Sequence, residues 1–196
     1  MKTMMRPLIL AILLASIATQ ANATDWQADA AHTNVGFSVS HLFTSVQGRF
    51  KDFEASIVFD VDHPMKTVVR ATVQAASINT DNEKRDKHLR SRDFFDVEKY
   101  PTLQFDSTEM KEWSGKKGKL AGNLTIHGVT KPVVFDVVFR GEGSDPWGNT
   151  RAGFLATLAI DRKDYGLNWN EVLETGGFLV GDEIEIRIDA EGILAE

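Results

Sequence analysis

The sequence contains no cysteine, which excludes disulfide bonds, thiolate metal sites, thiol catalysis and a lipid anchor on cysteine. Long apolar runs are also missing, because the stretch from residue 8 to 17 is about half of the roughly 20 residues that a membrane-spanning helix needs. Basic residues are outnumbered, with 22 Lys and Arg against 28 Asp and Glu. Such a chain repels nucleic acid and anionic headgroups over most of its surface, so any bound anion requires a local basic patch.

Catalytic motifs are absent as well. The chain has no Gly-x-Ser-x-Gly elbow, no His-Glu-x-x-His, no phosphate-cradling glycine loop and no calcium-loop spacing. Its five histidines are scattered singly, at positions 32, 41, 63, 88 and 127, and this spacing favours structural roles over metal ligation. The sequence therefore predicts a protein that is not an enzyme and that needs neither a metal nor a cofactor.

The first 23 residues have the order of a secretory signal peptide. Lys2 and Arg6 precede the apolar stretch, and the small-residue triplet Ala21-Asn22-Ala23 follows it. Cleavage after Ala23 predicts a soluble, exported domain of residues 24–196, which is long enough to bury a core as a single unit. Loss of Lys2 and Arg6 makes the formal charge −8.

Most of the remaining chain alternates apolar and polar residues, which is the period of a β-strand with one buried face. The clearest runs are 35–39, 53–61, 69–75, 103–107, 120–126, 133–139, 154–160 and 184–190. Turn-forming residues separate them, so the strands are expected to pair antiparallel. This pattern fits a sandwich and a closed barrel equally well, and a barrel of about eight or more strands has room for one ligand. The charged face of the last run, with Glu183, Glu185, Arg187 and Asp189, argues against an outer-membrane barrel.

One segment interrupts the strand pattern. Thr80 and Glu83 have the spacing of a capping box, and the pairs Glu83–Lys87 and Asp86–Arg90 support a short helix over residues 81–91. The following Asp93-Phe94-Phe95-Asp96 places two aromatic rings in a connection, where they are expected to pack against other apolar groups.

Two groups of side chains could contact a ligand. A basic run, Lys84, Arg85, Lys87, Arg90 and Arg92 with His88 inside it, could hold a phosphate at a barrel mouth or could simply be a solvated helix face. Aromatic residues near polar turns could line a pocket entrance or belong to the core; they are Phe37, Phe43, Phe94, Phe95, Phe154 and Trp169.

Several segments, in the same order along the chain, closely resemble the YceI-like polyisoprenoid-binding family. They are residues 32–42, 46–50, 76–80, 85–91, 93–96, 100–101, 122–132, 146–148, 153–154, 160–169 and 180–182. The resemblance implies an extended, lipocalin-like antiparallel β-barrel of about 8–10 strands with a short helix near residues 81–91. It also implies an apolar interior that takes the tail of an isoprenyl phosphate or quinone, no catalysis, a periplasmic location, links to stress or alkaline conditions, and homodimers in some members.

Together these observations predict a periplasmic lipid-binding protein with no nucleic-acid partner and no stable membrane insertion. The expected ligand contacts are Phe37, His41, Phe43, Arg85, His88, Arg90, Phe94, Phe95, Phe154 and Trp169. Two alternatives stay open: an enzyme acting on a lipid or lipid phosphate through His88 with Asp86 or Asp93, and an interaction protein whose barrel is filled and whose function lies on loops such as 141–149.

Overall fold

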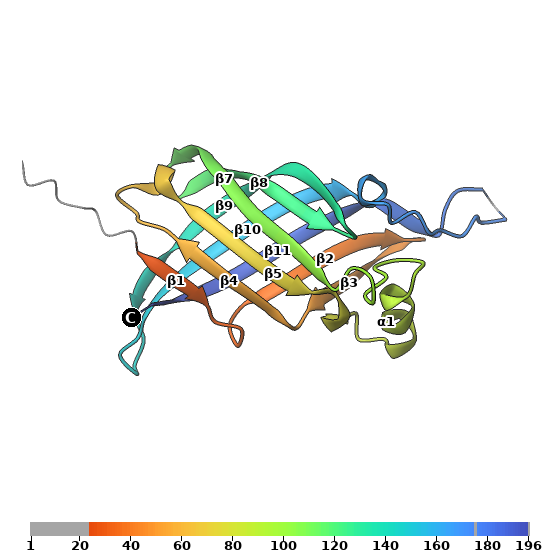
Figure 1. Ribbon diagram of the computed structural model, residues 1–196, viewed down its shortest axis with the longest axis horizontal. Coiled ribbons are helices and arrows are strands. Elements are labelled where there is room, and N and C mark those ends of the chain that lie inside the picture. The colour runs from red at the N-terminus through yellow and green to blue at the C-terminus, as the bar shows by residue number, and fades with distance from the viewer. Residues whose placement is uncertain (1–23, 175, 196) are drawn as a thin grey trace, which may run out of the picture.

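The computed structural model describes residues 24–174 and 176–195, and it is built almost entirely from antiparallel strands (Figure 1). The strands are β1 (Asp25–Ala28), β2 (Asn34–His41), β3 (Thr44–Phe50), β4 (Phe53–Val58), β5 (Val68–Gln74), β6 (Ile78–Asn79), β7 (Thr102–Ser114), β8 (Lys117–Ile126), β9 (Val129–Ser144), β10 (Thr150–Asp161) and β11 (Val180–Leu194). The α-helix α1 (Glu83–Arg90) is accompanied by three 3₁₀ turns, η1 (Pro64–Lys66), η2 (Ala75–Ser77) and η3 (Arg162–Tyr165).

The sheet closes on itself. Strands pair in the order β1-β4-β5-β7-β8-β9-β10-β11, and β11 then pairs with β1, which makes a closed ring of eight strands. Closure satisfies the backbone groups at what would otherwise be two sheet edges. The predicted antiparallel barrel is therefore confirmed, and the sandwich alternative is wrong.

Three further strands extend the barrel at one end. The first part of β11 pairs with β2, as in Ile186 opposite Phe37, while its last part pairs with β1, as in Leu194 opposite Trp26. Strands β3 and β6 continue outward from β2. Helix α1 lies beside this extension at the right of Figure 1, and the C-terminus lies at the opposite side of the picture. We call these the α1 end and the C-terminal end.

Alternation along each strand decides what faces the interior. Ala156 on β10 points inward and pairs with Ile188 on β11. Ala159, three residues further along β10, is exposed. Near the C-terminal end Trp26 is almost wholly buried, and its indole nitrogen donates to the carbonyl of Phe59 at 3.2 Å. The apolar residues that the period-2 pattern selected therefore form the barrel interior.

The short helix is present, but its N-terminal cap differs from the prediction. Asn82, not Thr80, is the N-cap, because its side-chain oxygen accepts from the backbone N–H of Arg85 at 3.0 Å. Asp86 accepts from Thr80, and Arg90 donates to the carbonyls of Ala76 and Ile78, so the expected Asp86–Arg90 pair is wrong. These two side chains fasten the helix to the preceding segment.

The predicted signal peptide, residues 1–23, lies outside the described residues. Within the part of the chain that the structure describes, no helix combines the length and apolar character that crossing a membrane requires.

Candidate functional site

The barrel interior contains a wide cavity of about 640 Å³ at the α1 end, which we call the outer cavity. Its wall combines apolar strand residues with side chains of α1 and of the connections that follow it. The wall includes Phe37, Val39, His41, Ile78, Lys84, Arg85, His88, Phe94, Phe95, Trp169, Leu179 and Ile184. The outer cavity, at the α1 end, thus combines an apolar wall with basic side chains.

A smaller cavity of about 190 Å³, the inner cavity, lies toward the C-terminal end. Its wall is nearly all apolar, and it ends against an aromatic cluster in which Phe59 contacts Trp113, Phe139 and Phe154, with ring centroids 4.8–5.5 Å apart.

The two cavities meet at a belt of shared wall residues, Phe37, Phe50, Leu103, Ile126 and Ile186. Small side chains on the inner side of this belt, among them Ala71 and Ala156, leave space that larger ones would fill. Gly48 leaves room for the ring of Phe37 in the belt, because a Cβ at position 48 would lie 2.3 Å from that ring. The two chambers therefore lie next to each other across this belt.

Arg85 is held rigidly in the wall of the outer cavity. Its Nε donates to Thr80 Oγ1 at 2.7 Å and its Nη2 donates to the Thr80 carbonyl at 2.8 Å. The Thr80 hydroxyl and backbone N–H in turn donate to buried Asp86, at 2.5 and 2.9 Å. Among the described residues Arg85 Nη1 has no hydrogen-bond partner, so this guanidinium has donors left for an anionic ligand group.

His88 lies beside Arg85 and is oriented by a carboxylate. Its Nε2 lies 2.9 Å from Asp93, and its ring meets those of Phe94 and Trp169 edge-on, at centroid distances of 5.1 and 4.8 Å. Asp86 is already engaged by Thr80, so of the two carboxylates considered as partners for His88, Asp93 is the one in contact. The aromatic rings shield one side of this polar group from water.

Arg162 supports the segment that carries Trp169. It is only 2% exposed, and its guanidinium donates to the carbonyls of Leu167, Trp169 and Gly181 and lies 3.2 Å from Asp182. A buried cation with this many partners fixes the backbone around it. Arg162 therefore sets the position of Trp169 in the cavity wall.

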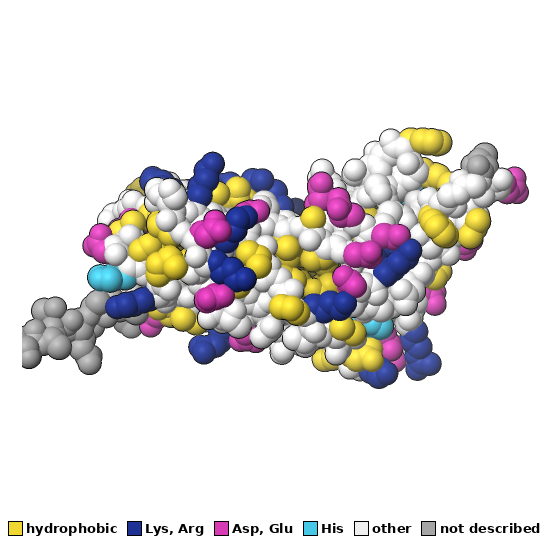
Figure 2. Space-filling model, turned by 90° about the horizontal axis from the view of Figure 1, so that it is seen from above, with side chains coloured by type: hydrophobic (Ala, Val, Ile, Leu, Met, Phe, Trp, Pro, Cys, Tyr) yellow, Lys and Arg dark blue, Asp and Glu magenta, His cyan; other side chains and the backbone are white. Residues whose placement is uncertain are grey.

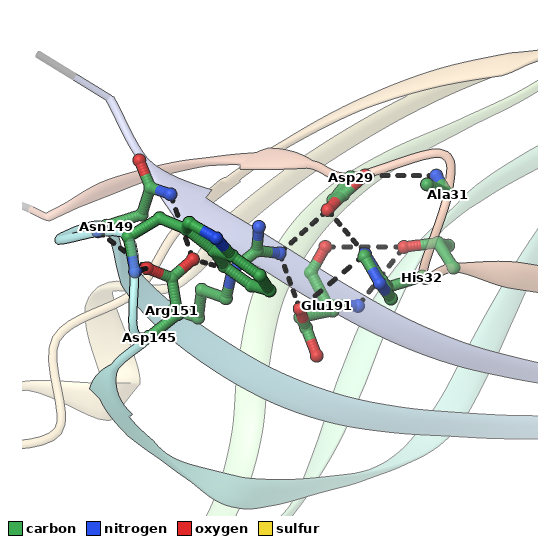
Figure 3. A network of polar contacts seen from close by, with 9 residues as sticks. Asp29, Ala31, His32, Asp145, Asn149, Arg151 and Glu191 are labelled. Atoms are coloured by element: carbon green, nitrogen blue, oxygen red, sulfur yellow. Dashed lines mark hydrogen bonds and ion pairs between the residues drawn. The ribbon is translucent and has the colours of Figure 1, made fainter.

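A second polar network lies at the C-terminal end (Figure 3). Arg151 donates to the carboxylates of Asp29, Asp145 and Glu191 at 2.6–2.7 Å, and His32 lies 2.7 Å from Asp29. The Arg151 hydrogen bond lowers the pKa of Asp29 to about 2 and holds that of Asp145 well below its usual range. Asp29, His32 and Glu191 have the spacing of metal ligands, but both carboxylates already form ion pairs with the guanidinium of Arg151. We call this network the arginine clasp.

The structure brings most of the predicted ligand residues together. Those in the wall of the outer cavity are Phe37, His41, Arg85, His88, Phe94, Phe95 and Trp169. Phe154 lies in the inner cavity, far along the barrel from the helix. Phe43 is fully exposed at the β2–β3 turn, and Arg90 is bound to backbone carbonyls; neither lines a cavity.

Several wall residues were not selected from the sequence. Trp113, Phe139 and Ala156 line the inner cavity, and Arg151 and Arg162 fasten the two ends. The alternating pattern marks Phe139 and Ala156 as inward-facing, but it does not distinguish a filled interior from a hollow one. Nothing in the local sequence indicates which carboxylates or carbonyls the two arginines reach.

Comparison with known proteins places these features in a family. A family model described as a YceI-like domain matches residues 26–192. A UPF0312 protein of Photorhabdus laumondii is 44% identical over 151 residues, covering 76% of this chain and 78% of the relative. A UPF0312 protein of Pseudomonas aeruginosa is 40% identical over 179 residues, covering 90% of each chain.

Solved structures share the architecture. The Campylobacter jejuni YCEI protein matches with a TM-score of 0.69 at 34% identity, covering 86% of this chain and 96% of that one. Burkholderia cenocepacia BcnA matches with a TM-score of 0.75 at 24% identity, covering 84% and 98%. A polyisoprenoid binding domain from Saccharophagus degradans matches with a TM-score of 0.65 at 14% identity, covering 87% and 98%, so it shares the fold. The family model and the sequence relatives show that this chain belongs to the YceI-like family.

Proposed function

We propose that this protein is a periplasmic carrier that sequesters a long-chain isoprenoid, of the isoprenyl phosphate or quinone type, inside its barrel. The observation that carries the proposal is the pair of adjoining apolar cavities inside the barrel. Their volumes together fall within the roughly 300–1,000 Å³ typical of ligand sites. Cavities of this size between the inward-facing side chains argue against the alternative of a filled barrel that acts only through its outer loops.

The two adjoining cavities lie along the length of the barrel, which favours a long and narrow ligand. Strand β11 has 15 residues, which at about 3.3 Å each span roughly 50 Å, or about 35–40 Å along the axis of a barrel with tilted strands. Each buried CH₂ contributes about 0.8 kcal/mol, so some twenty carbons supply ~16 kcal/mol before the costs of ordering and association. Tail burial is thus sufficient for binding, and the headgroup supplies a smaller contribution.

The polar groups favour one orientation of the lipid. Arg85, Lys84 and His88 all lie in the wall of the outer cavity, whereas the inner cavity offers almost no polar partner. We therefore propose that the headgroup binds at the α1 end and that the end of the tail lies beside Phe59. The name of the Saccharophagus degradans domain supports the isoprenoid class, although at its level of identity the likeness itself extends to the fold.

Four tryptophans make binding measurable. Trp169 lines the outer cavity and Trp113 the inner one, while Trp147 is exposed near the C-terminal end. After delipidation, a long isoprenyl phosphate should change the fluorescence of both cavity tryptophans, and the Trp113→Phe variant should lose only the inner-cavity part of the signal. A Trp147→Phe variant, as the control, should keep the whole change. No change on addition of isoprenoids to a folded apo protein would refute the proposal.

Binding without catalysis has its own test. His88 and Asp93 are in contact at the mouth, so the lipid-modifying enzyme stays a competing function. Native mass spectrometry of protein purified without delipidation should show a bound lipid. That lipid should have an unchanged mass after incubation with and without divalent metal, and a chemically altered lipid would favour the enzyme.

Export is part of the proposal. The positive start, apolar stretch and small-residue triplet of residues 1–23 support it. Protein recovered from the periplasm of a bacterial host should have an N-terminus at Thr24. Full-length protein retained in the cytoplasm would contradict the periplasmic assignment without affecting lipid binding.

A further inference from the structure

Exposed apolar side chains stand at the α1 end of the barrel. Phe43 is 100% exposed, and Val172, Phe178 and Leu42 are 74%, 58% and 47% exposed. We call these four residues the apolar rim. A hydrogen bond from the backbone N–H of Leu42 to the carbonyl of Leu179 connects the two loops that carry them. In Figure 2, hydrophobic side chains project at the right-hand end of the molecule.

The β2–β3 turn carries apolar residues against its local preference. His41 pairs with Thr44, so Leu42 and Phe43 alone form the connection, and Leu42 has a φ of +52°. Two-residue hairpin turns strongly favour Asn, Asp or Gly, because these residues tolerate positive φ. A leucine there is both conformationally unfavourable and exposed to water. Departures from local rules of this kind are expected where a surface has a function.

The apolar rim is continuous with the wall of the outer cavity. Leu42 and Phe43 directly follow the wall residue His41, and Phe178 directly precedes the wall residue Leu179. A lipid that moves between a bilayer and the cavity must cross this end without exposing its tail to water. Apolar residues at the opening would allow that movement.

Charge at the same end complements an anionic surface. Residues 83–92 contain Lys84, Arg85, Lys87, Arg90 and Arg92 against Glu83 and Asp86, in a chain whose overall charge is −6. Within the described residues, no ion pair involves Lys87 or Arg92, so both cations are free to meet lipid phosphates. Glu171 and Glu174 lie in the loop of Val172, and for this reason the attraction is assigned to the helix and not to that loop.

We propose that the α1 end docks on an anionic phospholipid bilayer, with the apolar rim among the lipids and the basic side of α1 against the headgroups. Docking of this kind is peripheral, because the rim consists of loop tips and not of a spanning segment. The inference goes beyond the proposed function, since it concerns a surface outside the cavities and a second partner.

Vesicle flotation tests the docking. Vesicles of phosphatidylethanolamine and phosphatidylglycerol, free of isoprenoid, should bind the mature protein, and the double variant Val172→Ser, Phe178→Ser should bind at least about tenfold more weakly. Trp147→Ser, which removes an aromatic residue that is 81% exposed at the opposite end, is the matched control and should bind like the wild type. Lys87→Gln with Arg92→Gln should reduce the preference for phosphatidylglycerol over purely zwitterionic vesicles.

Three measurements keep the outcomes distinct. Thermal unfolding checks that each variant is folded, and native mass spectrometry checks that the rim variant keeps its lipid load. Equal flotation of the wild type and the rim variant would overturn the docking proposal, as would a wild-type dimer that the rim variant converts to monomers. If native mass spectrometry finds no lipid in the wild type, while the wild type floats with vesicles and the rim variant does not, the proposed function is overturned and the docking proposal stands.

Discussion

Replacing Ala156 with leucine fills part of the inner cavity without changing charge or backbone geometry. Ala156 faces inward on β10 opposite Ile188, and it lines the inner cavity. Leucine adds three carbons to a space of about 190 Å³. A bound tail that reaches this chamber must give up a comparable volume.

The expected loss follows from the displaced carbons. At about 0.8 kcal/mol for each buried CH₂, three carbons correspond to ~2.4 kcal/mol, or about 50-fold in the dissociation constant. Lipids too short to pass the belt should bind as they do to the wild type. The stability of the apo protein should stay equal or rise, because the added side chain removes part of an unfilled space.

Titration of delipidated protein with isoprenyl phosphates of increasing length, followed by tryptophan fluorescence, checks this prediction. Ala159→Leu is the matched control, since Ala159 lies on the same strand but is exposed. The refuting result is a uniform loss of affinity for short and long lipids. An unchanged affinity for long lipids would equally show that the tail does not enter the inner cavity.

Three other perturbations give distinct expectations. Arg162→Met should lower the free energy of unfolding in urea by about 3–5 kcal/mol, because it leaves buried carbonyls without a donor. The control Lys163→Met, at the neighbouring position, should lower it by about 1 kcal/mol or less. Equal effects of the two substitutions would contradict the role given to Arg162. The pKa of Asp29 is lowered to about 2, so its contribution to stability is present above its ordinary pKa of 3.8 and is lost as the pH falls toward 2. Arg151→Gln should make the melting temperature depend less on pH over this acid range. An unchanged pH dependence of the melting temperature would argue against the arginine clasp. Gly48→Ala should push the Phe37 ring into the belt and weaken binding of lipids that span both cavities by about fourfold, while Gly143→Ala, which meets no neighbouring atom, should have no effect in the same titration.

The local pattern of the sequence was sufficient for most of the secondary structure, although it did not select β1, β3 or β6. Alternation from Val35 to Ala190 predicted antiparallel strands, and a short polar segment around Arg85 predicted the helix. Such features depend on neighbours within a few residues, so they can be read along the chain. The N-cap of the helix could not be identified in this way, because Thr80 and Asn82 are both good capping residues. The hydrogen bond from Thr80 to Asp86 engages Thr80, and Asn82 is the residue that caps the helix.

Resemblance to a family favoured a barrel, but the hollow interior depends on distant residues. Ala71, Phe135 and Ala156 come from separate strands, and only the closure of β11 on β1 brings their side chains around one axis. The same holds for Arg151, whose three carboxylate partners lie as far as 122 residues away. Period-2 alternation therefore determined which side chains point inward, whereas the tertiary structure decided that they stop short of meeting, because strand number and register set the width of a closed barrel.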